Sequence, residues 1–129
     1  MISSGTISLQ ITNNIAFLKF GHPSGNSFPS ILLQQLSEAF SEISKNDTVV
    51  AVVLQSEGKG PFCAGASFDE LIAINDLDSG KKFFSGFANV INAMKNCKKL
   101  IIGRIHGKAV GGGVGLAAAC DYTFATANS

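Results

Sequence analysis

Two segments rich in glycine and alanine each follow a continuously apolar stretch of this sequence. Residues 60–67, Gly-Pro-Phe-Cys-Ala-Gly-Ala-Ser, come after Val49–Leu54, and residues 107–115, Gly-Lys-Ala-Val-Gly-Gly-Gly-Val-Gly, come after Leu100–Ile105. Small residues let backbone N–H groups approach a ligand oxygen closely, and α/β sheets bind ligands beyond the carboxyl ends of their strands. Two such N–H groups on one carbonyl oxygen would stabilise its developing negative charge by about 2.7–4 kcal/mol each.

Two other interpretations of these glycines stay open at the level of the residues. Either segment alone is also typical of a plain turn or of a packing glycine. The run Gly111–Gly115 superficially resembles a phosphate-binding loop, but a GxGxxG motif would need glycine at position 116, where leucine stands, and no GKS or GKT follows. The spacing therefore argues against a dinucleotide or phosphate cradle.

Hydrophobic periodicity places the two segments in an α/β domain. Alternation at Thr6–Ile11 and Ile15–Phe20 predicts an antiparallel hairpin, and Val49–Leu54 and Leu100–Ile105 have the β-branched, apolar character of strands in a parallel sheet. The remaining expected elements are a loop at Gly21–Pro29, helices at Ser30–Ser44, Phe68–Asn75, Lys81–Asn96 and Gly111–Ala119, and a last strand at Tyr122–Ala125. This order of elements favours helical layers on a mixed sheet.

Composition narrows the classes of function. The chain has 129 residues, 46% of them hydrophobic, and a net charge of +1, which fits one globular domain without the strong field that attracts nucleic acid or an anionic membrane. We expect a cytoplasmic protein that binds neither nucleic acid nor membrane. Three widely spaced cysteines predict reduced core thiols, and His22 lacks neighbours at metal-ligand spacing, so we expect no metal site.

The two glycine segments together resemble the signature of the enoyl-CoA hydratase/isomerase (crotonase) superfamily. The resemblance lies in Phe62-Cys-Ala-Gly-Ala66 with Phe68 and Leu71, and in Ile105-His-Gly-Lys-Ala-Val-Gly-Gly-Gly113 with Cys120-Asp121. Gly25-Asn-Ser-Phe28 falls where that family has an asparagine-containing loop. The resemblance implies a crotonase-like fold over residues 1–129, corresponding to the N-terminal half of the family, without its C-terminal helices that complete the coenzyme A site and the trimer interface.

The resemblance also implies the residues of the site. The backbone N–H groups of Ala66 and Gly112 would form an oxyanion hole around the thioester carbonyl of an acyl-CoA. The substrate would further be lined by Ala64, Gly65, Ser67, Phe68 and Asp69. Coenzyme A is then part of the substrate, and no separate cofactor is expected. Phe68 could instead be a core aromatic, and Asp69 is expected to be solvated rather than catalytic.

The sequence departs from the family at its acids. Hydratases of this family that use two glutamates have the first glutamate three residues after the oxyanion glycine, and this chain has Gly115 at that position. The second glutamate of the family pattern belongs to a segment beyond Ser129. The leading hypothesis is an enzyme that hydrates, dehydrates or isomerises an acyl-CoA, with branched methylglutaconyl-type acyl groups among its candidate substrates. The full-length protein is expected to form a homotrimer or a dimer of trimers. The alternatives are a non-catalytic acyl-CoA-binding or structural module, or a fragment without function alone.

Other polar side chains are weaker candidates. His106 precedes Gly107 and could replace the missing acid beside the ligand loop, but a structural or hydrogen-bonded role is favoured. Glu57 and Glu70 are expected to face solvent, and Asp121 is expected to be structural.

Overall fold

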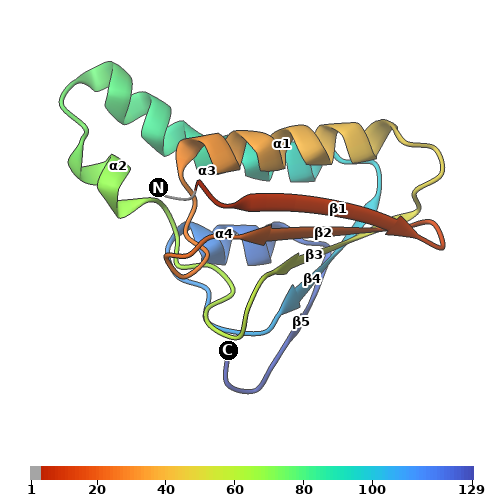
Figure 1. Cartoon of the computed structure of the whole chain (residues 1–129). Coiled ribbons are helices and arrows are strands. Elements are labelled where there is room, and N and C mark those ends of the chain that lie inside the picture. Colours follow the sequence, from red (N-terminus) through yellow and green to blue (C-terminus); the bar gives the residue numbers. More distant parts are fainter. Residues whose placement is uncertain (1–3) are drawn as a thin grey trace.

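The computed structural model describes residues 4–129, which form one five-stranded sheet with helices packed on it (Figure 1). The strands lie side by side in chain order, with β1 antiparallel to β2 and the others parallel to their neighbours. In chain order the elements are β1 (Thr6–Thr12), β2 (Ile15–Gly21), α1 (Ser30–Lys45), β3 (Ala51–Ser56), α2 (Phe68–Ile72), α3 (Leu77–Asn96), β4 (Leu100–Ile105), α4 (Gly112–Ala119) and β5 (Tyr122–Ala125). The expected mixed α/β architecture is confirmed.

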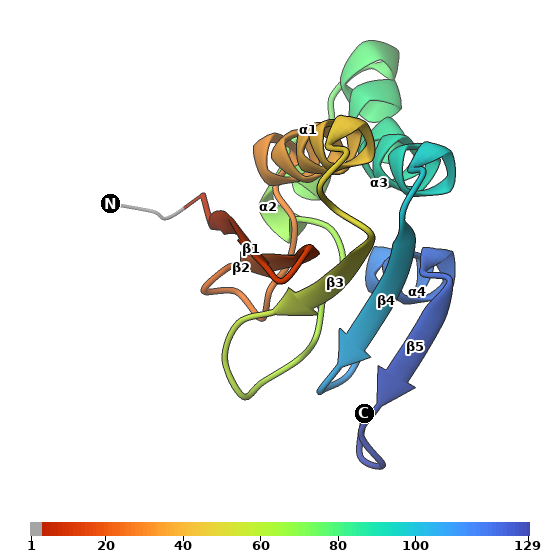
Figure 2. The ribbon, with the colours of Figure 1, turned by 90° about the vertical axis from the view of Figure 1, so that its right-hand side faces the viewer.

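The core lies between one face of the sheet and helices α1, α3 and α4 (Figure 2). Alternate residues of β2 and β3, such as Leu18, Val52 and Leu54, are fully buried on that face, because successive side chains of a strand point to opposite sides. Phe40 of α1 and Leu116 of α4 complete the same cluster. The opposite face carries no helix within the described residues, and Tyr122 and Phe124 are exposed there.

Helix α3 begins earlier than the periodicity predicts, at Leu77 rather than Lys81. Asp76 caps it, with its carboxylate accepting from the Ser79 backbone N–H at 2.7 Å while the Ser79 hydroxyl bonds the Asp76 backbone N–H. This capping also lowers the pKa of the Asp76 carboxyl, chiefly through the hydrogen bonds from Ser79. The periodicity of residues 81–96 also predicts Phe84 on the buried side of this helix, which is wrong, because its ring is 69% exposed.

Helix α2, in contrast to α3, is shorter than predicted, because it ends at Ile72 instead of Asn75. It begins at Phe68 after Ser67, whose hydroxyl caps the helix by accepting from the Glu70 N–H. No residue of α2 is buried, so this helix projects from the body of the protein (Figure 1). Among residues 4–129, no helix is long and apolar enough to cross a membrane.

Candidate functional site

The two glycine segments lie against each other at the carboxyl ends of the parallel strands β3 and β4. Cys63 and Ala109 form an isolated parallel bridge, in which the Cys63 N–H donates to the Lys108 carbonyl at 3.2 Å and the Val110 N–H donates to the Cys63 carbonyl at 2.9 Å. Parallel strands bring their carboxyl ends to one edge of a sheet, which explains why segments more than 40 residues apart meet. The expected proximity of these segments is therefore found.

Gly65 makes the closest approach between the segments. An ideal Cβ on this residue would lie 3.0 Å from the Val110 carbonyl oxygen and 3.7 Å from the Gly112 nitrogen, and its φ is +96°. A side chain is disfavoured both by the contact and by the backbone angle. Glycine at position 65 therefore permits the strand that carries Ala66 to lie beside the start of α4.

The Ala66 N–H points away from the neighbouring backbone. The bridge between Phe28 and Ala66 uses the residues on either side of Ala66: the Phe28 N–H donates to the Gly65 carbonyl at 2.8 Å, and the Ser67 N–H donates to the Phe28 carbonyl at 3.1 Å. In this parallel pattern the central N–H faces the opposite side. Within residues 4–129, the Ala66 N–H donates to no acceptor.

The Gly112 N–H is the first donor of helix α4. Gly111 precedes it as the N-cap with a φ of 56°, and no side chain caps the helix. The N–H groups of Gly113 and Val114 bond to the carbonyls of Val110 and Gly111, whereas that of Gly112 has no acceptor among the described residues. An uncapped helix start presents unpaired N–H groups and the positive end of the helix dipole, an arrangement that suits a ligand oxygen.

A surface pocket of about 530 Å³ lies beside the first segment and contains most of the expected lining residues. Ala64, Ala66, Ser67, Phe68 and Asp69 contribute to its walls, together with Ser4, His22, Ser24, Ser27 and Pro29. Gly112 and Gly115 are not in this lining, and Gly65 is the residue of the first segment that approaches α4. The structure thus brings the residues around Ala66 together in one pocket, and Gly112 lies outside this pocket at the start of the neighbouring helix α4.

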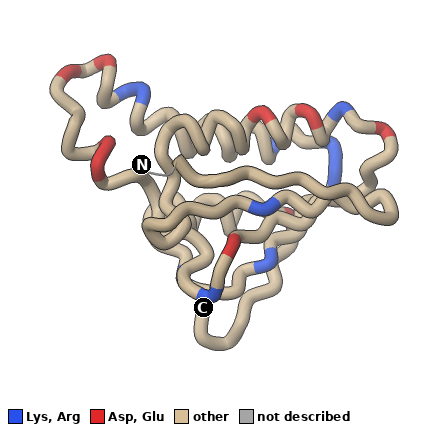
Figure 3. The backbone as a smooth tube through the Cα atoms, viewed as in Figure 1, with Lys and Arg blue, Asp and Glu red and all other residues tan. Residues whose placement is uncertain are grey.

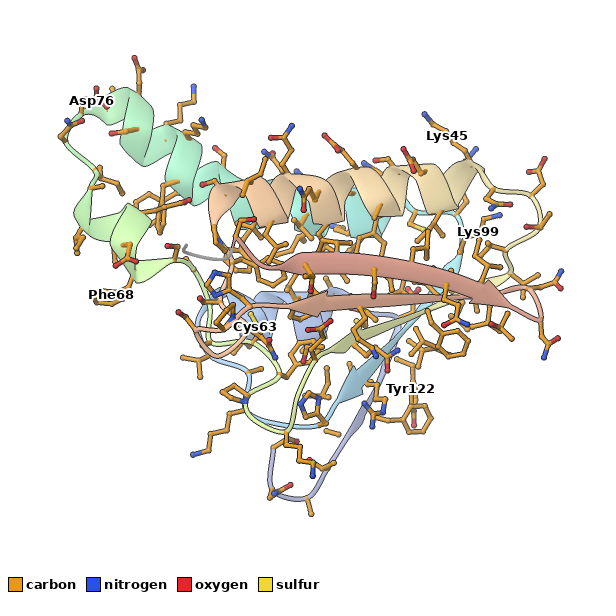
Figure 4. All side chains as sticks on the ribbon, viewed as in Figure 1. Lys45, Cys63, Phe68, Asp76, Lys99 and Tyr122 are labelled. Atoms are coloured by element: carbon orange, nitrogen blue, oxygen red, sulfur yellow. The ribbon has the colours of Figure 1, made fainter. Side chains whose placement is uncertain are left out.

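Phe68 is 75% exposed and extends outward from α2, whereas Cys63 lies in the interior (Figure 4). The alternative that Phe68 is a core aromatic is therefore wrong. Asp69 is exposed, as expected.

Burial raises the pKa of the Cys63 thiol to about 11, and the Gly65 N–H on its sulfur acts in the opposite direction, so this thiol stays protonated at neutral pH. Cys63 accordingly has a packing role rather than a nucleophilic one.

The cysteine and acid predictions have mixed outcomes. All three cysteines are free, but only Cys63 is buried, and Cys97 and Cys120 are partly exposed. Burial and then the charge of Asp121 raise the pKa of Cys120 to about 11. Asp121 is structural as predicted, because its carboxylate accepts from the Ile101 N–H at 2.7 Å and its own N–H bonds the Ile101 carbonyl.

His106 directly precedes the second segment, and Gly115 is the last residue of that segment. The two ring nitrogens of His106 are buried and make no hydrogen bond within residues 4–129, so the hydrogen-bonded alternative lacks a partner in this part of the chain. An ideal Cβ on Gly115 would meet the Ile91 side chain at 3.1 Å. The family position for the first acid therefore faces an apolar residue of α3.

Asn26 lies in the asparagine-containing loop of the family resemblance, and the structure gives it a positioning role that the sequence did not assign. Its side chain is buried and connects two loops: Oδ1 accepts from the His22 N–H at 3.0 Å, and Nδ2 donates to the carbonyls of Glu57 at 2.8 Å and Pro61 at 2.9 Å. The Ala64 N–H also donates to the Gly25 carbonyl beside it at 3.1 Å. Asn26 thereby fixes the loop that leads into residues 60–67.

We expect Asn26→Ala to lower the free energy of unfolding by about 2–4 kcal/mol, because two buried carbonyls and one N–H lose their partner. The matched control is Asn13→Ala: Asn13 also has positive φ, 50° against 58° for Asn26, but it is exposed and its side chain makes no hydrogen bond within residues 4–129. This control measures backbone strain alone, about 1 kcal/mol. Urea unfolding of both variants checks the prediction, and equal losses would contradict it.

Charge does not single out one face of this protein. Lys and Arg are interspersed with Asp and Glu along the chain (Figure 3). Within residues 4–129, no group of three or more His, Cys, Asp or Glu side chains is arranged to hold a metal ion. The N–H groups of Ala66 and Gly112, which have no acceptor within residues 4–129, lie at this edge of the sheet.

These features define a class of α/β protein in which backbone amides gather where two parallel strands end. The chain belongs to the enoyl-CoA hydratase/isomerase family, whose sequence profile matches residues 10–129. It is 35% identical over 104 residues to methylglutaconyl-CoA hydratase of Mus musculus, covering 81% of this chain and 33% of the mouse protein. It is 28% identical over 124 residues to short-chain-enoyl-CoA hydratase of Clostridium acetobutylicum, covering 95% of this chain and 47% of the bacterial protein.

Solved structures agree with this membership. The crystal structure of enoyl-CoA hydratase from Mycobacterium smegmatis superposes with a TM-score of 0.86 at 30% identity, covering 92% of this chain and 47% of that one. The chain spans between a third and about half of the length of the relatives described here. The crotonase-like fold expected from the sequence is confirmed.

Proposed function

We propose that this chain binds an acyl-CoA thioester and that the N–H groups of Ala66 and Gly112 together bind its carbonyl oxygen. The observation that carries the proposal is that these two amides, from adjoining segments, have no acceptor within residues 4–129. Unpaired buried or half-buried donors are costly unless a ligand or solvent uses them. A thioester oxygen would satisfy both.

The chemistry follows from where charge develops on the substrate. Addition of water across the α,β double bond, its reverse, or migration of that bond all pass through an enolate-like species with negative charge on the thioester oxygen. Donors fixed in advance stabilise that charge more than they stabilise the neutral carbonyl, which lowers the barrier. The helix dipole of α4 acts in the same direction at Gly112.

The pocket beside Ala66 is the proposed location of the coenzyme A portion. Ala64, Ser67, Phe68 and Asp69 line it, and the exposed Phe68 ring offers an apolar surface to the pantetheine or acyl group. Coenzyme A enters as part of the substrate, and no separate cofactor is proposed. The proton donor or acceptor would come from outside residues 4–129, since Gly115 has no side chain to supply one.

The test is calorimetric titration of the chain with butyryl-CoA, a saturated thioester that cannot be hydrated. We expect saturable binding to one site per chain, and much weaker binding of S-butyl-CoA, a thioether that keeps the coenzyme A and alkyl parts but lacks the carbonyl. Binding of the two ligands with equal affinity would rule out recognition of the carbonyl. Absence of binding to either would remove the proposed function.

A non-catalytic acyl-CoA-binding module is the second candidate, favoured by Gly115 and its contact with Ile91. The two functions are separated by assaying turnover of crotonyl-CoA and 3-methylglutaconyl-CoA by the full encoded protein, including any residues beyond Ser129. Turnover supports the enzyme, and faster turnover of the methylglutaconyl substrate would support a branched acyl group. Thioester binding without turnover of either supports the module.

A further inference from the structure

Helix α1 begins without a cap from its own sequence. Its N-cap residue is Pro29, which makes no side-chain capping bond, and its first turn contains no acidic residue. The N–H groups of Leu32 and Leu33 bond back to the Pro29 carbonyl at 3.0 and 3.1 Å, which leaves the Ser30 N–H without a local acceptor. A helix start of this kind leaves its first N–H groups to an acceptor from elsewhere in the chain, to a ligand or to solvent.

Glu70 supplies that acceptor from α2, 40 residues further along the chain. Both of its carboxylate oxygens lie 3.0 Å from the Ser30 nitrogen, and the Ser30 hydroxyl donates to Glu70 Oε2. A carboxylate at a helix N-terminus is stabilised both by charge-assisted hydrogen bonds and by the helix dipole. The expectation that Glu70 faces solvent is therefore wrong, because its side chain is half-buried and bound to α1.

This contact matters because little else holds α2 in place. The helix buries none of its residues, and Phe68 and Ile72 are 75% and 72% exposed. The preceding residues are attached by the bridge to Phe28 and by the Ser67 hydroxyl, which accepts from the Glu70 N–H at 3.3 Å. Residues 64–67 are thus held by backbone hydrogen bonds to Gly25 and Phe28, and the Glu70–Ser30 contact holds the residues that follow, Phe68 and Asp69.

We propose that Glu70 is a positioning residue for the ligand site: by capping α1 it fixes the start of α2, which contributes Phe68 and Asp69 to the pocket beside the Ala66 N–H. The inference rests on the proposed acyl-CoA function and adds to it a residue that does not line the pocket around Ala66. Removing the carboxylate would release the Ser30 N–H and let α2 move outward. The pocket wall formed by Phe68 and Asp69 would then lose its fixed place beside Ala66, while the core beneath the sheet would stay intact.

The experiment compares four forms of the chain: wild type, Glu70→Ala, Glu70→Gln and Glu42→Ala. Glu42 is an exposed carboxylate on α1 that makes no hydrogen bond or ion pair within residues 4–129, so its removal controls for lost surface charge. Two quantities are measured well below the unfolding midpoint of each form: the affinity for butyryl-CoA, and the rate of amide hydrogen exchange over residues 66–72.

We expect Glu70→Ala to weaken binding and to accelerate exchange at residues 66–72 by about tenfold each, the size that loss of a charged hydrogen bond implies. Glu70→Gln keeps one oxygen acceptor and should recover part of both effects, and Glu42→Ala should match wild type. A purely structural role would lower only the unfolding midpoint. Wild-type affinity and exchange in Glu70→Ala would overturn the inference.

The outcomes also separate this inference from the proposed function. If wild type binds butyryl-CoA and Glu70→Ala binds it equally well, the positioning role fails and the acyl-CoA function stands. If wild type binds no thioester, the acyl-CoA function fails and the ligand part of this inference fails with it. Exchange at residues 66–72 then still decides whether Glu70 holds the segment.

Discussion

Gly112→Pro should lower the rate of enolate-forming turnover in the full encoded protein by about 10²–10³-fold, the effect of losing one oxyanion donor. Proline has no N–H, so the thioester oxygen would keep only the Ala66 donor. Proline is well tolerated at the first position of a helix, which is the position of Gly112 in α4, so the helix should still form. Turnover of crotonyl-CoA measures the effect.

The matched control is Gly112→Ala, which adds a side chain and keeps the N–H. An ideal Cβ at position 112 would lie 2.6 Å from three atoms of the Phe87 ring, so both variants force this half-buried ring to shift. The comparison therefore isolates the hydrogen-bond donor from the added volume. Equal activities in the alanine and proline variants would mean that the Gly112 N–H is not used.

Gly107→Ala should destabilise the protein by about 3 kcal/mol, the upper part of the range for overpacking. An ideal Cβ at this position would lie 2.3 Å from the Gly60 carbonyl oxygen and 3.1 Å from the Phe62 nitrogen. Both neighbours are backbone atoms and cannot turn aside as a side chain could. The two segments would be forced apart, and the hydrogen bonds between Cys63 and its partners in residues 108–110 would be strained or lost.

Gly60→Ala is the control for this change. Gly60 lies in the opposing loop, and a Cβ built on it would meet no atom within 4 Å. We expect the free energy of unfolding of this variant to lie within about 0.5 kcal/mol of the wild-type value, as is usual for open surface positions. Urea unfolding at constant temperature measures both variants, and similar midpoints for them would contradict the close packing of the segments.

The sequence predicted the order and type of every element of the fold. Two patterns made this possible: the short length and β-branched content of the run at Val49–Leu54 indicate a strand, and the helical spacing of Leu32, Leu36 and Phe40 indicates a helix. Element ends were predicted less well. Helix α3 starts at Leu77 because the Asp76–Ser79 capping pair begins it, and that pair is visible in the sequence. The exposure of Phe84 was not foreseen, since a run of apolar residues does not say which of them a neighbouring helix covers.

Only those residues of the candidate site that belong to short sequence motifs were predicted. The residues around Ala66 and the first donor of α4 follow from glycine patterns and from the family resemblance. Asn26 and Glu70 act through partners 31 to 40 residues away, namely Glu57, Pro61 and Ser30. No local pattern marks such contacts, and Glu70 was expected to face solvent for that reason.

The most direct test of the two-donor account is an NMR titration that follows the backbone amides of Ala66 and Gly112. The chain is titrated with butyryl-CoA and, separately, with S-butyl-CoA, which lacks the carbonyl. The account predicts downfield shifts of both amide protons with the thioester and not with the thioether, because only the thioester offers an oxygen to accept their hydrogen bonds. A bound thioester that shifts neither amide, or only one of them, would contradict it.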